Sequence, residues 1–209
     1  MSLDKTLTEV RYAYRILWEF QRRILDTVRL ISDQFDDRHF YHWSNYKWAH
    51  GARGGTAPFN FFPEHFLPLY GASFLYLSTE LKKARLQPEN WMLEMCVIPD
   101  TAPFKAFEAQ EQFDPLELEF GAPEVTKSLI RLIAWKCEGK FPKNSTWFNH
   151  VWRGMDWPQL SADGEILSQG DGKVTSVAFS REMTELADRQ QIIDFATEAK
   201  SVFLSKLNV

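Results

Sequence analysis

The sequence contains few cysteines, and their spacing excludes two classes of protein. Cys96 and Cys137 are the two cysteines among 209 residues, with no Cys-x-x-Cys pair and no cysteine-histidine cluster. A disulfide scaffold and a cysteine-rich zinc site are therefore excluded. Each cysteine lies in an apolar run typical of a strand, so we expect both thiols to be buried as small apolar side chains.

Long apolar runs and a strong charge of one sign are also missing. No run approaches the roughly 20 residues of a membrane-spanning helix, and the first ten residues, MSLDKTLTEV, lack the basic and apolar regions of a signal peptide. The net charge of −4 provides no overall attraction for nucleic acid or an anionic membrane. We therefore expect a cytoplasmic protein that does not contact the membrane.

The sequence also lacks the motifs of common reaction types. It has no Gly-x-Ser-x-Gly turn, and the glycine-rich segment 51–55, GARGG, lacks the Lys-Ser/Thr ending of a phosphate-binding loop. Glu94, Asp100 and Lys136 resemble the acidic pair and lysine of a metal nuclease, but without that site's close spacing. We expect no cofactor and favour a non-enzymatic function, with the biological process unknown.

A long helix is predicted over residues 5–35 from an apolar row with alternating steps of three and four. Further apolar residues flank this row and widen it beyond a narrow two-helix seam, so we expect the helix to pack on the protein's own sheet. The row consists of Leu7, Val10, Tyr14, Leu17, Gln21, Ile24, Val28, Ile31 and Phe35.

The polar side of this helix and the polar break in its apolar row leave two questions open. Residues with alternating charge occupy the opposite face, which indicates exposed ion pairs. Gln21 interrupts the apolar row, and one polar residue in a seam is also typical of a coiled coil, so the alternatives are a monomer and a weak homodimer. The charged residues are Arg15, Glu19, Arg22, Asp26, Arg29 and Asp33.

Downstream of residue 70 the pattern predicts β-structure followed by a second helix. Short apolar or alternating runs lie between turn residues, and their short connections favour an antiparallel arrangement of about five strands. The runs are 71–80, 90–100, 116–120, 128–138 and 173–180, with an irregular insertion at 140–172 and a helix at 187–207. We predict one α+β domain over 1–209, with its helices on one face of a sheet at 71–180.

The segment 36–70 is predicted to be a long aromatic loop region. Its rings lie beside Lys, His and Arg, a combination found at protein interfaces and at sites that stack nucleic-acid bases. A third alternative is that the rings cover the sheet. We favour a protein partner, with a nucleotide or single-stranded nucleic acid as the alternative, and expect Trp43 or Trp48 to be exposed. The predicted contact residues are Trp43, Tyr46, Lys47, Trp48, His50, Arg53, Trp147 and Trp152.

A weak metal-site pattern lies at the end of the predicted first helix. Asp36, Asp37, His39 and His42 combine carboxylates and imidazoles, which bind divalent metals. Their spacing is looser than that of a helical His-Glu-x-x-His motif, and polar residues also gather at ordinary helix ends. A metal-dependent hydrolase or nuclease that uses these residues is the rival hypothesis.

Overall fold

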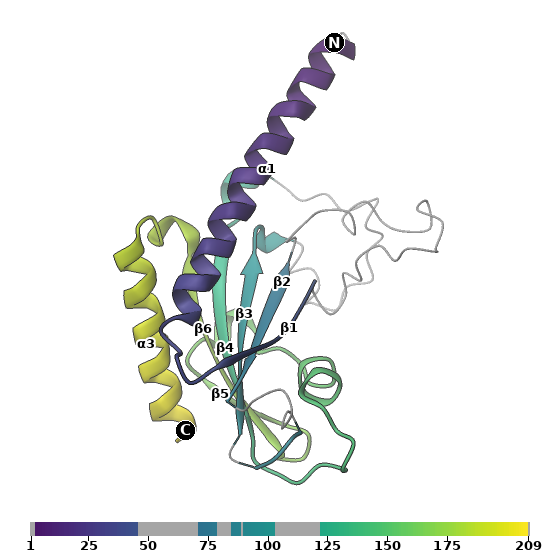
Figure 1. Ribbon diagram of the computed structural model, residues 1–209, viewed down its shortest axis with the longest axis vertical. Coiled ribbons are helices and arrows are strands. Elements are labelled where there is room, and N and C mark those ends of the chain that lie inside the picture. The colour runs from purple at the N-terminus through teal and green to yellow at the C-terminus, as the bar shows by residue number, and fades with distance from the viewer. Residues whose placement is uncertain (1–2, 46–70, 79–84, 89, 103–121, 209) are drawn as a thin grey trace.

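A computed structural model describes residues 3–45, 71–78, 85–88, 90–102 and 122–208 of the chain (Figure 1). Among these residues a long helix comes first, strands follow, and another helix comes last. The elements are α1 (Leu3–Ser32), β1 (His39–Asn45), β2 (Ala72–Leu77), β3 (Trp91–Ile98), β4 (Leu129–Cys137), β5 (Ile166–Gln169), β6 (Val174–Glu182) and α3 (Arg189–Leu207).

The strands form a six-stranded antiparallel sheet in the order β1-β2-β3-β4-β6-β5. The predicted α+β class is confirmed, with six strands rather than about five. Four of the predicted runs correspond to β2, β3, β4 and β6, whereas 116–120 lies outside the described residues. β1 and β5 were not predicted, because both are edge strands whose many exposed positions weaken the apolar signal.

α1 and α3 pack on one face of the sheet and form its larger core. Ile31 of α1 and Phe203 of α3 are fully buried in a cluster with Leu93 and Met95 of β3 and Leu132 of β4. The second helix starts where expected because Asp188 and Gln191 form a capping box that satisfies its first backbone N–H groups.

The other face of the sheet is covered by the insertion at 140–172. Trp147 and Trp152, from a π-helical turn, are buried against Leu75, Met92 and Trp135 of the sheet. The insertion that the sequence analysis treated as irregular is therefore the second layer of core, and the sheet is apolar on both faces.

A buried arginine fastens the rest of this insertion to β4. The Arg131 side chain is 1% exposed and donates hydrogen bonds to the carbonyls of Pro158 (2.5 Å) and Gln159 (2.7 Å). It also pairs with the Asp163 carboxylate at 3.0 Å. Because carbonyls and a carboxylate satisfy the charge, the guanidinium holds three points of an otherwise irregular segment against the sheet.

Both cysteines are buried, as expected, and neither belongs to a disulfide among the described residues. Among the helices of the described residues, none has the length and apolarity needed to cross a membrane.

Candidate interaction surface

The N-terminal half of α1 projects beyond the sheet and is exposed (Figure 1). The predicted burial of the apolar row is confirmed from Ile24 to Phe35 but is wrong for Leu7, Val10 and Tyr14, which are exposed. A helix of 30 residues is about 45 Å long, whereas a strand of eight residues spans about 26 Å. The helix is therefore longer than the sheet that covers it.

Two apolar rows lie on different sides of this projecting half. The first, called the seam row, lies on the same line of the helix as the buried residues. The second, called the groove row, lies on the side that faces the start of α3, as its contacts below show. The seam row is Leu3, Leu7, Val10, Tyr14 and Leu17, and the groove row is Tyr12, Ile16 and Phe20.

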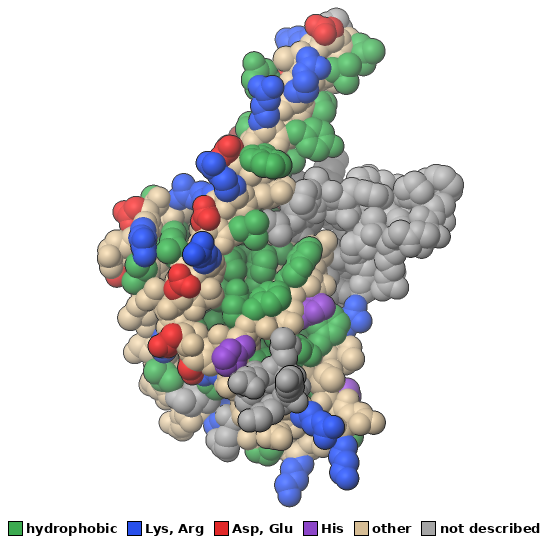
Figure 2. Space-filling model, viewed as in Figure 1, with side chains coloured by type: hydrophobic (Ala, Val, Ile, Leu, Met, Phe, Trp, Pro, Cys, Tyr) green, Lys and Arg blue, Asp and Glu red, His purple; other side chains and the backbone are tan. Residues whose placement is uncertain are grey.

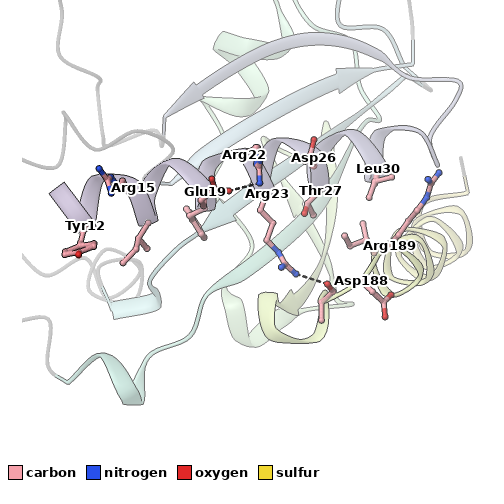
Figure 3. Close-up of a pocket in the computed structure, with 14 residues that line it drawn as sticks. Tyr12, Arg15, Glu19, Arg22, Arg23, Asp26, Thr27, Leu30, Asp188 and Arg189 are labelled. Atoms are coloured by element: carbon pink, nitrogen blue, oxygen red, sulfur yellow. Dashed lines mark hydrogen bonds and ion pairs between the residues drawn. The ribbon is translucent and has the colours of Figure 1, made fainter. Parts of the chain in front are cut away.

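The groove row forms one wall of an open groove of about 900 Å³ between α1 and the beginning of α3 (Figure 3). Arg23 spans the groove and donates to the carbonyls of Leu186 and Ala187, each at 3.0 Å. The lining residues are Tyr12, Arg15, Ile16, Glu19, Phe20, Arg22, Arg23, Asp26, Thr27, Leu30, Ala187, Asp188, Arg189 and Ile192. The groove combines an apolar wall with charges of both signs.

The start of α3 in this groove is already occupied by the protein's own carboxylate. The Asp188 side chain accepts a hydrogen bond from the Gln191 backbone N–H at 2.9 Å. Helix N-termini attract anions, but here the cap supplies the negative charge. This helix end is therefore not a binding site for an external phosphate.

Exposed rings of β1 continue the apolar surface on the other side of α1 (Figure 2). Phe40 is 49% exposed and meets Tyr76 edge-to-face at 5.6 Å between ring centroids, and Trp43 is 53% exposed and stacks on Phe74 at 6.5 Å. The expectation that Trp43 or Trp48 is exposed is confirmed by Trp43.

Contacts at the end of α1 show which side of the helix faces β2. Burial raises the pKa of Tyr76 above its usual range, a hydrogen bond with Ser32 opposes this shift, and Asp33 adds to it. Ser32 follows Leu25 by seven residues and Trp18 by fourteen, so all three lie along one flank of α1, next to the seam row. The flank of α1 beside the seam row therefore faces β2, the strand that carries Tyr76.

The other predicted contact residues fall into two groups. Tyr46, Lys47, Trp48, His50 and Arg53 lie outside the described residues. Trp147 and Trp152 are 0% and 1% exposed, because the insertion turns them toward the sheet instead of toward solvent. This placement removes both tryptophans from the predicted surface.

The predicted metal candidates are distributed among separate contacts. Asp36 lies 3.6 Å from Lys200, and Asp37 pairs with Arg38 at 2.9 Å. His39 is exposed, while the ring of His42 packs on Phe148 at 4.3 Å, and burial and then Arg153 lower its pKa. Within the described ranges, no group of three or more His, Cys, Asp or Glu side chains is arranged to hold a metal.

Arg38, which follows the end of α1, contacts both Trp91 and Asp37. Its guanidinium lies 3.5 Å from the centre of the Trp91 ring, and burial lowers its pKa to about 10 against the attraction of Asp37. A stacked, partly buried cation next to Asp37 gives that carboxylate a structural role.

The resemblance to a metal nuclease fails on strand register. Trp91 pairs with Lys136, and Glu94 pairs with Ile133, so Glu94 and Lys136 lie on opposite faces of the sheet. Lys136 donates to the Leu207 carbonyl at 2.9 Å on the helix-covered face. The two side chains therefore do not act on one substrate.

Glu94 instead forms a buried hydrogen-bond network that was not predicted from the sequence. Its carboxylate accepts hydrogen bonds from the Ser73 hydroxyl (2.6 Å) and from the indole N–H groups of Trp135 and Trp152 (both 2.8 Å). A glutamate inside the apolar run WMLEMCVI was the available signal, since a buried carboxylate needs donors. With Glu94 0% exposed, the network joins the sheet to the insertion and contacts no solvent.

Comparison with known proteins supplies the family. The family model described as PM0109 matches residues 1–206. A protein of Pasteurella multocida (strain Pm70), named "Uncharacterized protein PM0109", is 22% identical over 167 residues, which cover 77% of this chain and 73% of the relative. No solved structure matches significantly. Because the family model spans nearly the whole sequence, this chain belongs to the PM0109 family.

Proposed function

We propose that the chain is a non-enzymatic cytoplasmic binding protein that holds another protein against the apolar surface of β1 and the N-terminal half of α1. We include in this binding surface the predicted loop residues that follow β1 in sequence, which are Tyr46, Lys47, Trp48, His50 and Arg53. The central residue of the proposed surface is Trp43, whose ring stacks on Phe74 and is 53% exposed to solvent.

The single observation that carries the proposal is the clustering of exposed apolar side chains. Among the described residues, all but three of the large apolar side chains that are exposed lie on α1 or β1. Soluble proteins rarely leave large contiguous apolar surfaces uncovered unless a partner uses them, and aromatic residues dominate binding energy at such interfaces. The apolar character of the described surface favours protein over nucleic acid.

The proposal is tested with a photo-crosslinking residue placed at position 43 of the full chain in cells. Position 166 provides a matched control, because Ile166 and Trp43 are both 53% exposed. We expect a discrete crosslinked protein from position 43 alone, identified by mass spectrometry and then purified for titration with this chain. Trp43→Ala should weaken that purified complex by about 2 kcal/mol or more.

Three outcomes would contradict the proposal. Equal crosslinking from positions 43 and 166 would show that the surface is not selective. Crosslinks to nucleic acid instead of protein, with affinity that falls steeply with salt, would favour the alternative partner. Unchanged affinity of the purified complex with Trp43→Ala would place the contact elsewhere.

A further inference from the structure

We propose that the projecting half of α1 pairs with the same segment of a second copy of this chain as a short antiparallel coiled coil. This inference rests on the proposed function, because it divides the same exposed surface between a second copy and the other partner. It assigns the seam row of α1 to self-association and leaves Phe40 and Trp43 of β1 to the other partner.

The seam row has the spacing that a coiled coil requires. From Leu3 to Leu17 its residues alternate steps of four and three, and the same line continues to Ile24 and Val28, which are buried on the sheet. Such a row lies along one side of the helix, where a facing helix or sheet can cover it. Leu3 is 73% exposed and Tyr14 is 71% exposed, so the part beyond the sheet has the same apolar pattern but no cover from the described residues.

One antiparallel register makes this segment complementary to itself. If Leu7 packs against Val10 of the second copy, Leu3 packs against Tyr14 of the second copy, and the twofold axis repeats both layers. In this register, Asp4 on one helix flanks Arg11 on the other, also twice. Thr6 and Ala13 meet on the opposite flank, where neither carries a charge.

The Arg11 side chain can change its hydrogen-bond partner from Thr8 to Asp4 of the second copy. In the single chain it donates to the Thr8 hydroxyl at 2.8 Å, an exposed contact within the same helix. An exposed hydrogen bond to a neutral hydroxyl contributes little net stability, and a carboxylate is a stronger acceptor for a guanidinium. Rotation of Arg11 toward Asp4 of the second copy therefore costs little.

The neighbouring arrangements are less favourable. Sliding the antiparallel pair by one heptad would place the two Arg11 side chains beside each other across the axis. A parallel pair would set Thr6 beside Arg11 without a charge partner, and would bring both sheets to the same end of the coil. The proposed overlap uses residues 3–14 and ends about 15 Å before Ile24, where α1 enters the core.

The size of this contact sets its expected strength. Four layers of seam side chains bury on the order of 500 Å² per copy, less than the roughly 800 Å² per partner of a standard stable interface. We therefore expect a reversible dimer whose population rises with protein concentration. A permanent dimer would require more surface than the projecting half supplies.

The first experiment is analytical ultracentrifugation of the full chain over a wide concentration range. We expect a monomer–dimer equilibrium, which Val10→Lys should weaken at least tenfold. Ile16→Lys is the matched control, because Ile16 is on the same exposed half but in the groove row. Circular dichroism of both variants should show unchanged helix content.

A charge exchange tests the register. Arg11→Asp leaves Asp4 facing a second carboxylate, and Asp4→Arg leaves Arg11 facing a second guanidinium, so each alone should weaken dimerisation several-fold. The double variant Asp4→Arg/Arg11→Asp should restore the dimer to within about threefold of the original.

The inference is overturned if the chain stays monomeric at every concentration, or if Ile16→Lys weakens the dimer as much as Val10→Lys. A double variant no better than the single ones would overturn the register. These failures are distinguishable from failure of the proposed function, because a monomer would still give the crosslinked partner at position 43.

Discussion

Val10 and Val28 belong to one apolar row of α1, yet Val28 is 4% exposed and Val10 is 42% exposed. The C-terminal half of the helix lies on β3 and β4 with α3 beside it, whereas the N-terminal half extends past the ends of the strands (Figure 1). The amino-acid pattern is the same in both halves. An apolar row therefore specifies which face of a helix is to be covered. The length of the sheet decides whether the same chain covers that face.

The largest expected effect comes from the same substitution in the two halves. Val28→Asp should lower the free energy of unfolding by about 3–5 kcal/mol, because it buries an unpaired carboxylate. Val10→Asp should change it by less than about 0.5 kcal/mol in the monomer. Urea unfolding at low protein concentration measures both, and equal losses would show that the projecting half is covered within the chain.

Arg23 lies where the two halves meet and tests what fixes α1 against α3. Arg23→Ala should cost about 1 kcal/mol, because it removes the hydrogen bonds to the carbonyls of Leu186 and Ala187. Arg22→Ala is the control, since the Arg22 side chain forms an exposed pair with Glu19 of the same helix. Thermal unfolding of both variants gives the difference, and no difference would mean that the Arg23 contacts are exchanged for water without loss.

Gln21 is the half-buried polar residue in the row between the two halves. Gln21→Leu should alter stability by less than about 1 kcal/mol and leave the monomer–dimer equilibrium unchanged, because the proposed overlap ends at residue 14. Light scattering at several concentrations checks this expectation. If the average mass of Gln21→Leu differs from that of the original chain at the same concentration, the seam extends to residue 21, which would contradict the short register.

The smallest effect is expected on the charged face. Arg22 and Glu19 pair at 2.7 Å with side chains 70% and 61% exposed, as the alternating charges predicted. Arg22→Glu should cost well under about 1 kcal/mol, because solvent and salt screen an exposed pair. Chemical denaturation with and without added salt measures the cost, and loss of folding would reveal a buried contact on this face.

The sequence was sufficient for the elements whose signal is local. The 3.6-residue period defined α1 and α3, and alternating or continuous apolar runs defined β2, β3, β4 and β6. β1 was missed because its rings resemble those of a loop, and its pairing with β2 depends on residues more than 25 positions away. The candidate surface was predicted only in part, through Trp43.

What the sequence determined by itself is therefore the set of apolar faces and the order of helices and strands, because helix and strand periodicity is written in neighbouring residues. Only the tertiary structure decided which of those faces are covered. It turned Trp147 and Trp152 inward, where Trp152 donates to Glu94, and it left Val10 and Trp43 exposed. Burial depends on which distant segments meet and on how far each of them extends. A local sequence pattern contains neither piece of information.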